Sequence, residues 1–174
     1  MDDITESTST LSTAQSIVED IVWATASTVS PNGVPRSRLV HPVWYWPAGG
    51  PVGYVASRPT PLRVAHIEAH PTMALFYWSP KHDTVAIDAT AEWVPDDDLL
   101  DVWDEIAATP APMGFDPYTI WPGGPTSHDY GVLRLVAYRV TARRGVDKLA
   151  TWRRSDAALL VSAGQSERPL RIGD

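Results

Sequence analysis

Short apolar runs broken by turn sequences constrain the fold of this chain more than any other feature. Runs of alternating or β-branched residues are typical of strands, and clusters of Pro, Gly and Asn between them are typical of turns. We count about six such strands, and a mainly β chain of this kind favours an antiparallel barrel with a few added helices. The runs are residues 23–30, 34–46, 52–57, 72–78, 84–94 and 132–142, with a last short one within 146–153.

Three short helices are predicted around these strands. A capping-box spacing at Ser12 begins the first, after a Ser/Thr-rich segment of residues 1–11 that we expect to be disordered. Thr60 and Pro61 have the N-cap and N1 arrangement of a second helix. The third is expected over residues 99–108, where preceding aspartates favour the helix dipole.

Length and composition exclude several classes of protein. The 174 residues suit one domain, which we place at residues 12–154, followed by a tail of residues 155–174 without a clear assignment. The chain has no cysteine, so disulfides, thiolate metal sites and a cysteine nucleophile are excluded. A net charge of −7 argues against nucleic-acid binding. The N-terminus lacks signal-peptide features and no apolar run approaches the ~20 residues that span a bilayer, so we expect a soluble, cytoplasmic protein.

The arginines are unevenly distributed for such an acidic chain. Clustered guanidinium groups can bind a small anion, although solvated surface charge is the plainer interpretation. Arg58 and Arg63 flank the expected start of the second helix at Thr60, and a helix N-terminus is itself an anion site. The two clusters are Arg36, Arg38, Arg58 and Arg63, and Arg139, Arg143, Arg144, Arg153 and Arg154.

Other candidate sites are weak. His66 and His70 lie four residues apart on the second helix, but a third metal ligand is missing from the pattern, so we expect solvent-facing histidines and no metal. Ser57 is not set in a nucleophile elbow and the order of His and Asp does not support a triad. We therefore assign no catalytic residue.

The order of three segments resembles the pyridoxamine 5′-phosphate oxidase-like family, also called the split-barrel flavin and deazaflavin reductases. Residues 35–44 look like the early cofactor strand of that family, residues 62–71 like its phosphate loop and helix, and residues 84–92 like the next strand with its Thr-Ala-Glu ending. The resemblance covers residues 23–95 well and residues 131–153 loosely. It implies a six-stranded antiparallel split β-barrel of the α+β class and a homodimer whose two sites take residues from both subunits.

The resemblance also implies which residues bind the cofactor. The second strand would border the ring, the end of the next strand would approach the ring or its ribityl chain, and two arginines would bind the phosphate. A polar ring contact and a residue of the C-terminal strand, which can reach the partner's site, complete the set. In that order the residues are Arg38, Leu39, Val40 and His41, then Ala56 and Ser57, then Arg58 and Arg63, and finally Thr84 and Trp152.

The family resemblance leaves the cofactor open between FMN and the deazaflavin coenzyme F(420). Flavin-binding members often carry Ser-Arg-Lys in the phosphate loop, whereas residues 61–63 here are Pro-Leu-Arg. The implied activity is that of an oxidoreductase that transfers hydride or electrons to a small organic substrate. A protein that stores or senses the same cofactor without turnover is the alternative. A vitamin B6 oxidase is disfavoured because the C-terminal end lacks that enzyme's substrate motif.

Replacing Arg63 by glutamate tests the phosphate assignment. Arg63→Glu turns a charge-assisted contact into repulsion and is expected to weaken the binding of FMN or the deazaflavin several-fold or more. Titration of the purified variant with each cofactor measures this. Unchanged affinity would remove Arg63 from the site.

Overall fold

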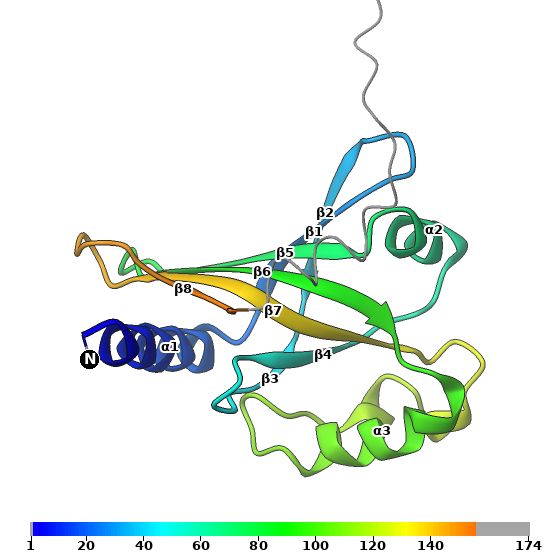
Figure 1. Ribbon diagram of the computed structural model, residues 1–174. Helices are drawn as coiled ribbons and strands as arrows, with labels where there is room; N and C mark the ends of the chain where they lie inside the picture. The colour runs from blue at the N-terminus through cyan, green and yellow to red at the C-terminus, as the bar shows by residue number, and fades with distance from the viewer. Residues whose placement is uncertain (1, 156–174) are drawn as a thin grey trace, which may run out of the picture.

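A strongly curled antiparallel sheet forms the body of the protein, with three α-helices packed around it (Figure 1). The computed structural model describes residues 2–155. The strands are β1 (Ala24–Val29), β2 (Pro35–Val40), β3 (Val43–Tyr45), β4 (Val52–Ala56), β5 (Thr72–Trp78), β6 (Thr84–Trp93), β7 (Val132–Arg143) and β8 (Ala150–Arg153). The helices are α1 (Asp2–Ile21), α2 (Pro61–Ala69) and α3 (Leu99–Ala108).

The strand order β2-β1-β5-β6-β7-β4-β3, with β8 also on β7, confirms the mainly β antiparallel prediction. The sheet has eight strands rather than six because the expected long strand 34–46 is divided at His41 and Pro42 and because the short run expected within 146–153 also joins the sheet, as β8. Proline has no N–H group to donate to a ladder, so pairing stops there. Before the break β2 pairs with β1, and after it β3 pairs with β4. One continuous stretch of chain therefore supplies both ends of the strand order.

Alternate side chains of β5 and β6 point to one face of the sheet and form much of the main hydrophobic core. Leu75, Tyr77, Val85 and Ile87 are completely or almost completely buried, while their neighbours in sequence face outward. The Trp44 indole N–H donates to the Tyr77 hydroxyl at 2.8 Å, so these two buried polar groups are paired. A second cluster forms where α3 packs its buried side chains against β3, the start of β7 and the segment before β7.

The N-terminal segment differs from its prediction, because α1 already begins at Asp2 and the described part of residues 1–11 is helical rather than disordered. Ser12 is not an N-cap: its hydroxyl donates to the Thr8 carbonyl inside the helix at 3.0 Å. Tertiary packing explains the difference, since Thr10 is buried and Leu11 packs against the same core as the fully buried Ile17 and Val18. Burial of one apolar face stabilises a helix whose local composition is unfavourable.

The helices take positions at different ends of the sheet. Figure 1 shows α1 below β8 and one end of β7, and α3 below β4 and the other end of β7. The second helix begins as predicted, with Thr60 as N-cap and Pro61 in its first turn, and it ends before Pro71. Among residues 2–155, none of the helices has both the length and the apolar character needed to cross a membrane. The predicted C-terminal tail lies outside the described residues, apart from residue 155.

Candidate functional site

A cavity of about 750 Å³ opens between β2, the end of β4, the N-terminus of α2 and the segment after α3. Its volume lies in the range of small-molecule sites, which is about 300–1,000 Å³. The structure brings eight of the ten predicted cofactor residues to this cavity. They are Arg38, Leu39, Val40, His41, Ala56, Ser57, Arg58 and Arg63.

Two predicted residues do not line the cavity. Thr84 begins β6 and lies opposite Trp78 and Arg143 in the neighbouring strands. Trp152 on β8 is buried beside Gly50, whose φ of +102° and close approach to the indole leave no room for a side chain. Neither residue reaches the cavity within its own subunit, and a contribution to a partner's site stays a prediction.

Seven further residues line the cavity and were not predicted from the sequence. Trp23 precedes β1, Thr60 and Leu62 surround the start of α2, and four residues come from the Pro/Gly-rich segment after α3. That segment carries no periodic pattern of apolar residues, so the sequence does not indicate which of its side chains face the sheet. The four residues are Phe115, Thr119, Ile120 and Trp121.

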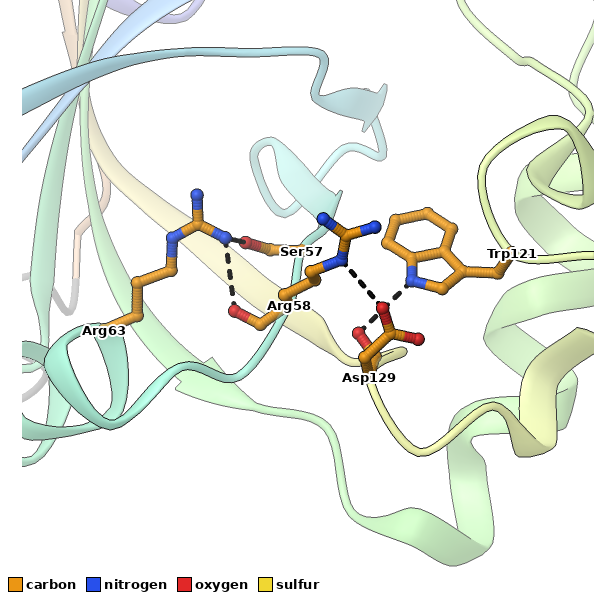
Figure 2. A network of polar contacts seen from close by, with 5 residues as sticks. All are labelled: Ser57, Arg58, Arg63, Trp121 and Asp129. Atoms are coloured by element: carbon orange, nitrogen blue, oxygen red, sulfur yellow. Dashed lines mark hydrogen bonds and ion pairs between the residues drawn. The ribbon is translucent and has the colours of Figure 1, made fainter. Parts of the chain in front are cut away.

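The Arg63 side chain is held near the N-terminus of α2 by hydrogen bonds to the preceding loop (Figure 2). Its Nη1 donates to the Ser57 hydroxyl at 2.6 Å and to the Arg58 carbonyl at 3.1 Å. Its backbone N–H donates to the Thr60 hydroxyl at 3.4 Å, which is the N-cap bond of α2. Among the described residues, Nε and Nη2 of Arg63 have no hydrogen-bond partner. Two donor groups of a fixed guanidinium therefore remain for a ligand.

Arg58 is paired with a carboxylate that no sequence motif had singled out. Its Nε lies 2.8 Å from Oδ2 of Asp129, and Figure 2 shows this pair beside Trp121. The Trp121 indole N–H donates to the Asp129 carbonyl at 3.2 Å, which ties the aromatic wall to the same residue. Asp129 precedes β7 by a few residues, and its distance in sequence from Arg58 explains why pattern analysis missed the pair. The charge of Arg58 is thus partly neutralised.

Arg38 carries a charge without a carboxylate partner in the described part of the chain. Its Nη2 donates to the Thr28 hydroxyl at 3.1 Å. Burial lowers the pKa of Arg38, and the positive charge of Arg63 lowers it further. Two guanidinium groups that repel each other at one cavity form a site that a bound anion stabilises.

His66 is completely buried, so the prediction of a solvent-facing histidine was wrong. Its Nδ1 lies 2.9 Å from Oγ1 of Thr28, which is also buried. Packing of α2 against β1 turns this side of the helix toward the sheet, and the isolated helix pattern did not reveal which face would be covered. Burial lowers the pKa of His66, as do the charges of Arg38 and Arg36, so the imidazole is neutral at pH 7.

His41 stands between two aromatic side chains at the cavity wall. Its ring centroid lies 5.1 Å from those of Trp23 and Phe115. Burial lowers the pKa of His41, against an opposing effect of the Met113 and Pro112 backbone. Its Nε2 is buried without a hydrogen-bond partner among the described residues. The three rings give this end of the cavity an apolar, aromatic wall.

The sequence matches a known family over most of its length. The profile of the pyridoxamine 5′-phosphate oxidase family matches residues 12–144. None of the curated proteins matches the chain significantly.

Solved structures share the fold at low sequence identity. A Clostridium acetobutylicum protein related to general stress protein 26 of B. subtilis is 15% identical with a TM-score of 0.67, over 86% of this chain and 97% of that one. A heme-binding protein from Mycobacterium smegmatis is 16% identical with a TM-score of 0.62, over 86% and 60% of the two chains. An FMN-binding protein from Nostoc punctiforme, related to pyridoxamine 5′-phosphate oxidase, is 12% identical with a TM-score of 0.52, over 84% and 93%. At these identities the similarity concerns the fold.

The buried histidine predicts a specific dependence of stability on pH. Because the folded state resists protonation of His66 and the unfolded chain accepts a proton near the ordinary pKa of 6.5, the free energy of unfolding should fall as pH drops below that value. His66→Asn keeps a polar group but cannot titrate, so the fall should be shallower in the variant. Urea unfolding of both proteins between pH 7.5 and 5 measures the two slopes. Equal slopes would show that His66 does not titrate differently in the folded state.

Proposed function

The chain belongs to the pyridoxamine 5′-phosphate oxidase family, and we propose that its cavity binds a flavin or deazaflavin cofactor for redox chemistry on a small organic substrate. The observation that carries this proposal is the pair Arg38 and Arg63. Both line one cavity, neither forms an ion pair in the described part of the chain, and the charge of one depresses the pKa of the other. Two unpaired guanidinium groups at one cavity are better stabilised by the phosphate of a cofactor than by water alone.

The cavity residues suit both parts of a phosphorylated planar cofactor. Arg63 and the N-terminus of α2 offer donors and positive charge to the phosphate. Trp23, Phe115 and Trp121 offer the flat apolar surfaces on which a ring system packs. The FMN-binding protein from Nostoc punctiforme shares this fold, which supports the choice of cofactor class.

The bound ring would supply the hydride or electron transfer, as cofactors do in redox enzymes. The protein would bind the phosphate through Arg63 and Arg38, orient the ring along β2 and exclude water with the aromatic wall. None of these tasks needs an acid, base or nucleophile of the protein, which agrees with the absence of a catalytic motif in the sequence.

The fold shared with the heme-binding protein from Mycobacterium smegmatis suggests heme as a second planar, anionic cofactor. Heme is commonly held by an axial histidine whose nitrogen reaches the iron. His41 is the one histidine among the lining residues. Its ring packs between Trp23 and Phe115, and its Nε2 is buried, so this nitrogen is not exposed to the cavity. The lining therefore favours a flavin or deazaflavin over heme.

The choice between FMN and the deazaflavin rests on the phosphate side. Arg58 would be a second phosphate ligand for FMN, but Asp129 already binds its Nε. A deazaflavin with a longer anionic tail needs less concentrated charge, and its tail can leave through the open mouth of the cavity. We keep both cofactors in the proposal, and we keep storage or sensing without turnover as the alternative use of the same site.

A homodimer is part of the proposal because an apolar strip lies exposed on the outer face of the sheet. Leu39, Thr25 and Phe76 lie side by side across β2, β1 and β5, and Leu39 and Phe76 are 67% and 47% exposed. Trp23 and Trp78 are also about half exposed. Exposed apolar patches of this kind mark interaction surfaces. Trp23 and Leu39 also line the cavity, so a second copy on this face would help to close it.

Cofactor titration with matched arginine variants tests the proposed site. The visible spectrum of the purified protein, followed by titration with FMN and with the deazaflavin, should give saturable binding of one of them. Arg38→Ala is expected to weaken it several-fold through the loss of a charge-assisted contact. Arg134→Ala is the control. Because Arg134 pairs with Glu92 outside the cavity, this variant should bind the cofactor as tightly as wild type.

Three results separate the alternatives. Binding of neither cofactor, or equal losses in Arg38→Ala and Arg134→Ala, would contradict the proposed site. A Soret band with iron would favour heme instead. Bound cofactor that can be reduced but is not reoxidised by any candidate acceptor would support storage or sensing over catalysis.

Replacement of one exposed aromatic residue tests the dimer. Phe76→Glu places a charge in the strip and should shift the protein from dimer to monomer in sedimentation equilibrium. Leu100→Glu is the control, because Leu100 is similarly exposed on α3 and does not belong to the strip. A wild-type monomer, or dimers of equal affinity in both variants, would contradict this interface.

A further inference from the structure

We infer that His66 is a positioning residue, which holds the Arg38 guanidinium at the cavity through the hydroxyl of Thr28. The inference rests on the proposed function, since it concerns how an arginine of the cofactor site is oriented. It adds a residue that does not line the cavity and that the sequence pattern assigned to the solvent.

Three elements meet at this relay. His66 comes from α2, Thr28 from β1 and Arg38 from the edge strand β2. Nδ1 of His66 lies 2.9 Å from Oγ1 of Thr28, and Nη2 of Arg38 lies 3.1 Å from the same oxygen. His66 and Thr28 are 0% and 2% exposed, so water does not compete for these bonds.

The direction of the hydrogen bonds follows from the chemistry of the groups. A guanidinium can only donate, so the Thr28 oxygen accepts from Arg38. The Thr28 hydroxyl can still donate one hydrogen bond, and His66 is its other partner among the described residues. Nδ1 of a neutral imidazole can accept that hydrogen bond. The chain Arg38 to Thr28 to His66 therefore runs in one direction, and it places the imidazole hydrogen on Nε2, which has no partner among the described residues.

The neutral form of His66 is required for this direction. The charged and titratable groups that face it are Arg38 and Arg36 on β2 and His70 on its own helix, and all of them disfavour an imidazolium. Because Nε2 already carries the hydrogen of the neutral ring, a second proton would go to Nδ1 and would bury a positive charge that faces only positively charged or titratable basic groups. Protonation at Nδ1 would also remove the acceptor of Thr28.

The relay matters because Arg38 has little else to fix it. It lies on an edge strand, and the bond to Thr28 is its one hydrogen bond from the guanidinium among the described residues. An arginine that is free to rotate loses side-chain entropy when it binds a ligand, whereas one that is held in place has already lost part of it. Holding Arg38 in advance should raise affinity for the phosphate or ring of the cofactor.

A double-mutant cycle with a rescue variant tests the relay. In the full chain, His66→Leu removes the acceptor and is expected to weaken binding of the preferred cofactor by about three- to ten-fold. His66→Asn offers an amide oxygen near the position of Nδ1 and should remain within about two-fold of wild type. In an Arg38→Ala background, His66→Leu should cause no further loss. Thr28→Val, which removes the linking hydroxyl with little change in volume, should reproduce His66→Leu if that variant does not fold.

A second measurement does not depend on the cofactor. The ¹⁵N relaxation of the Arg38 Nε–H group in the free protein should show faster internal motion in His66→Leu and Thr28→Val than in wild type and His66→Asn. Unchanged motion of Arg38, or an equal loss of affinity with and without Arg38, would overturn the inference. Failure of the wild-type protein to bind either cofactor would instead contradict the proposed function, and the relaxation data would still decide the relay.

Discussion

Much of this structure depends on the interruption of one strand at His41 and Pro42. Because a proline cannot donate to a ladder, the chain leaves β1 there and resumes pairing with β4, so β2 and β3 become the two ends of the strand order. The residues just before the break, from Arg38 to His41, line the cavity together with the end of β4. The same interruption that prevents a continuous strand therefore produces the wall of the site.

Electrostatics gives this cavity its character in a protein with a net charge of −7. Away from the cavity, arginines are paired with carboxylates of neighbouring segments. These ion pairs are Arg134 with Glu92, Arg139 with Asp88 and Arg144 with Asp83. Arg38 and Arg63 have no such partner in the described residues, and Arg58 shares its charge with Asp129. Under the proposed function, an acidic surface with a locally uncompensated positive site would favour a small anion over a polyanion such as nucleic acid.

The cavity and the exposed apolar strip are physically continuous. Trp23 and Leu39 contribute to both, because the residues at the start of β1 and the end of β2 lie where the outer face of the sheet meets the opening. Cofactor binding and subunit association would then stabilise each other, since each removes the same apolar side chains from water. The segment after α3 contributes Phe115 and Trp121 to the cavity lining, and Asp129 ties that segment to Arg58.

The sequence by itself determined most of the local elements. Alternation in β5 and β6, the N-cap at Thr60 and the stop before Pro71 depend on neighbouring residues, and they agree with the structure. The family order of segments also located most of the cavity lining before any geometry was known. Tertiary structure alone decided the burial of His66, the pairing of Arg58 with Asp129, the helical state of the residues before Ser12 and the aromatic wall after α3. These features depend on contacts between segments far apart in the chain, and local periodicity carries no information about which of them will meet.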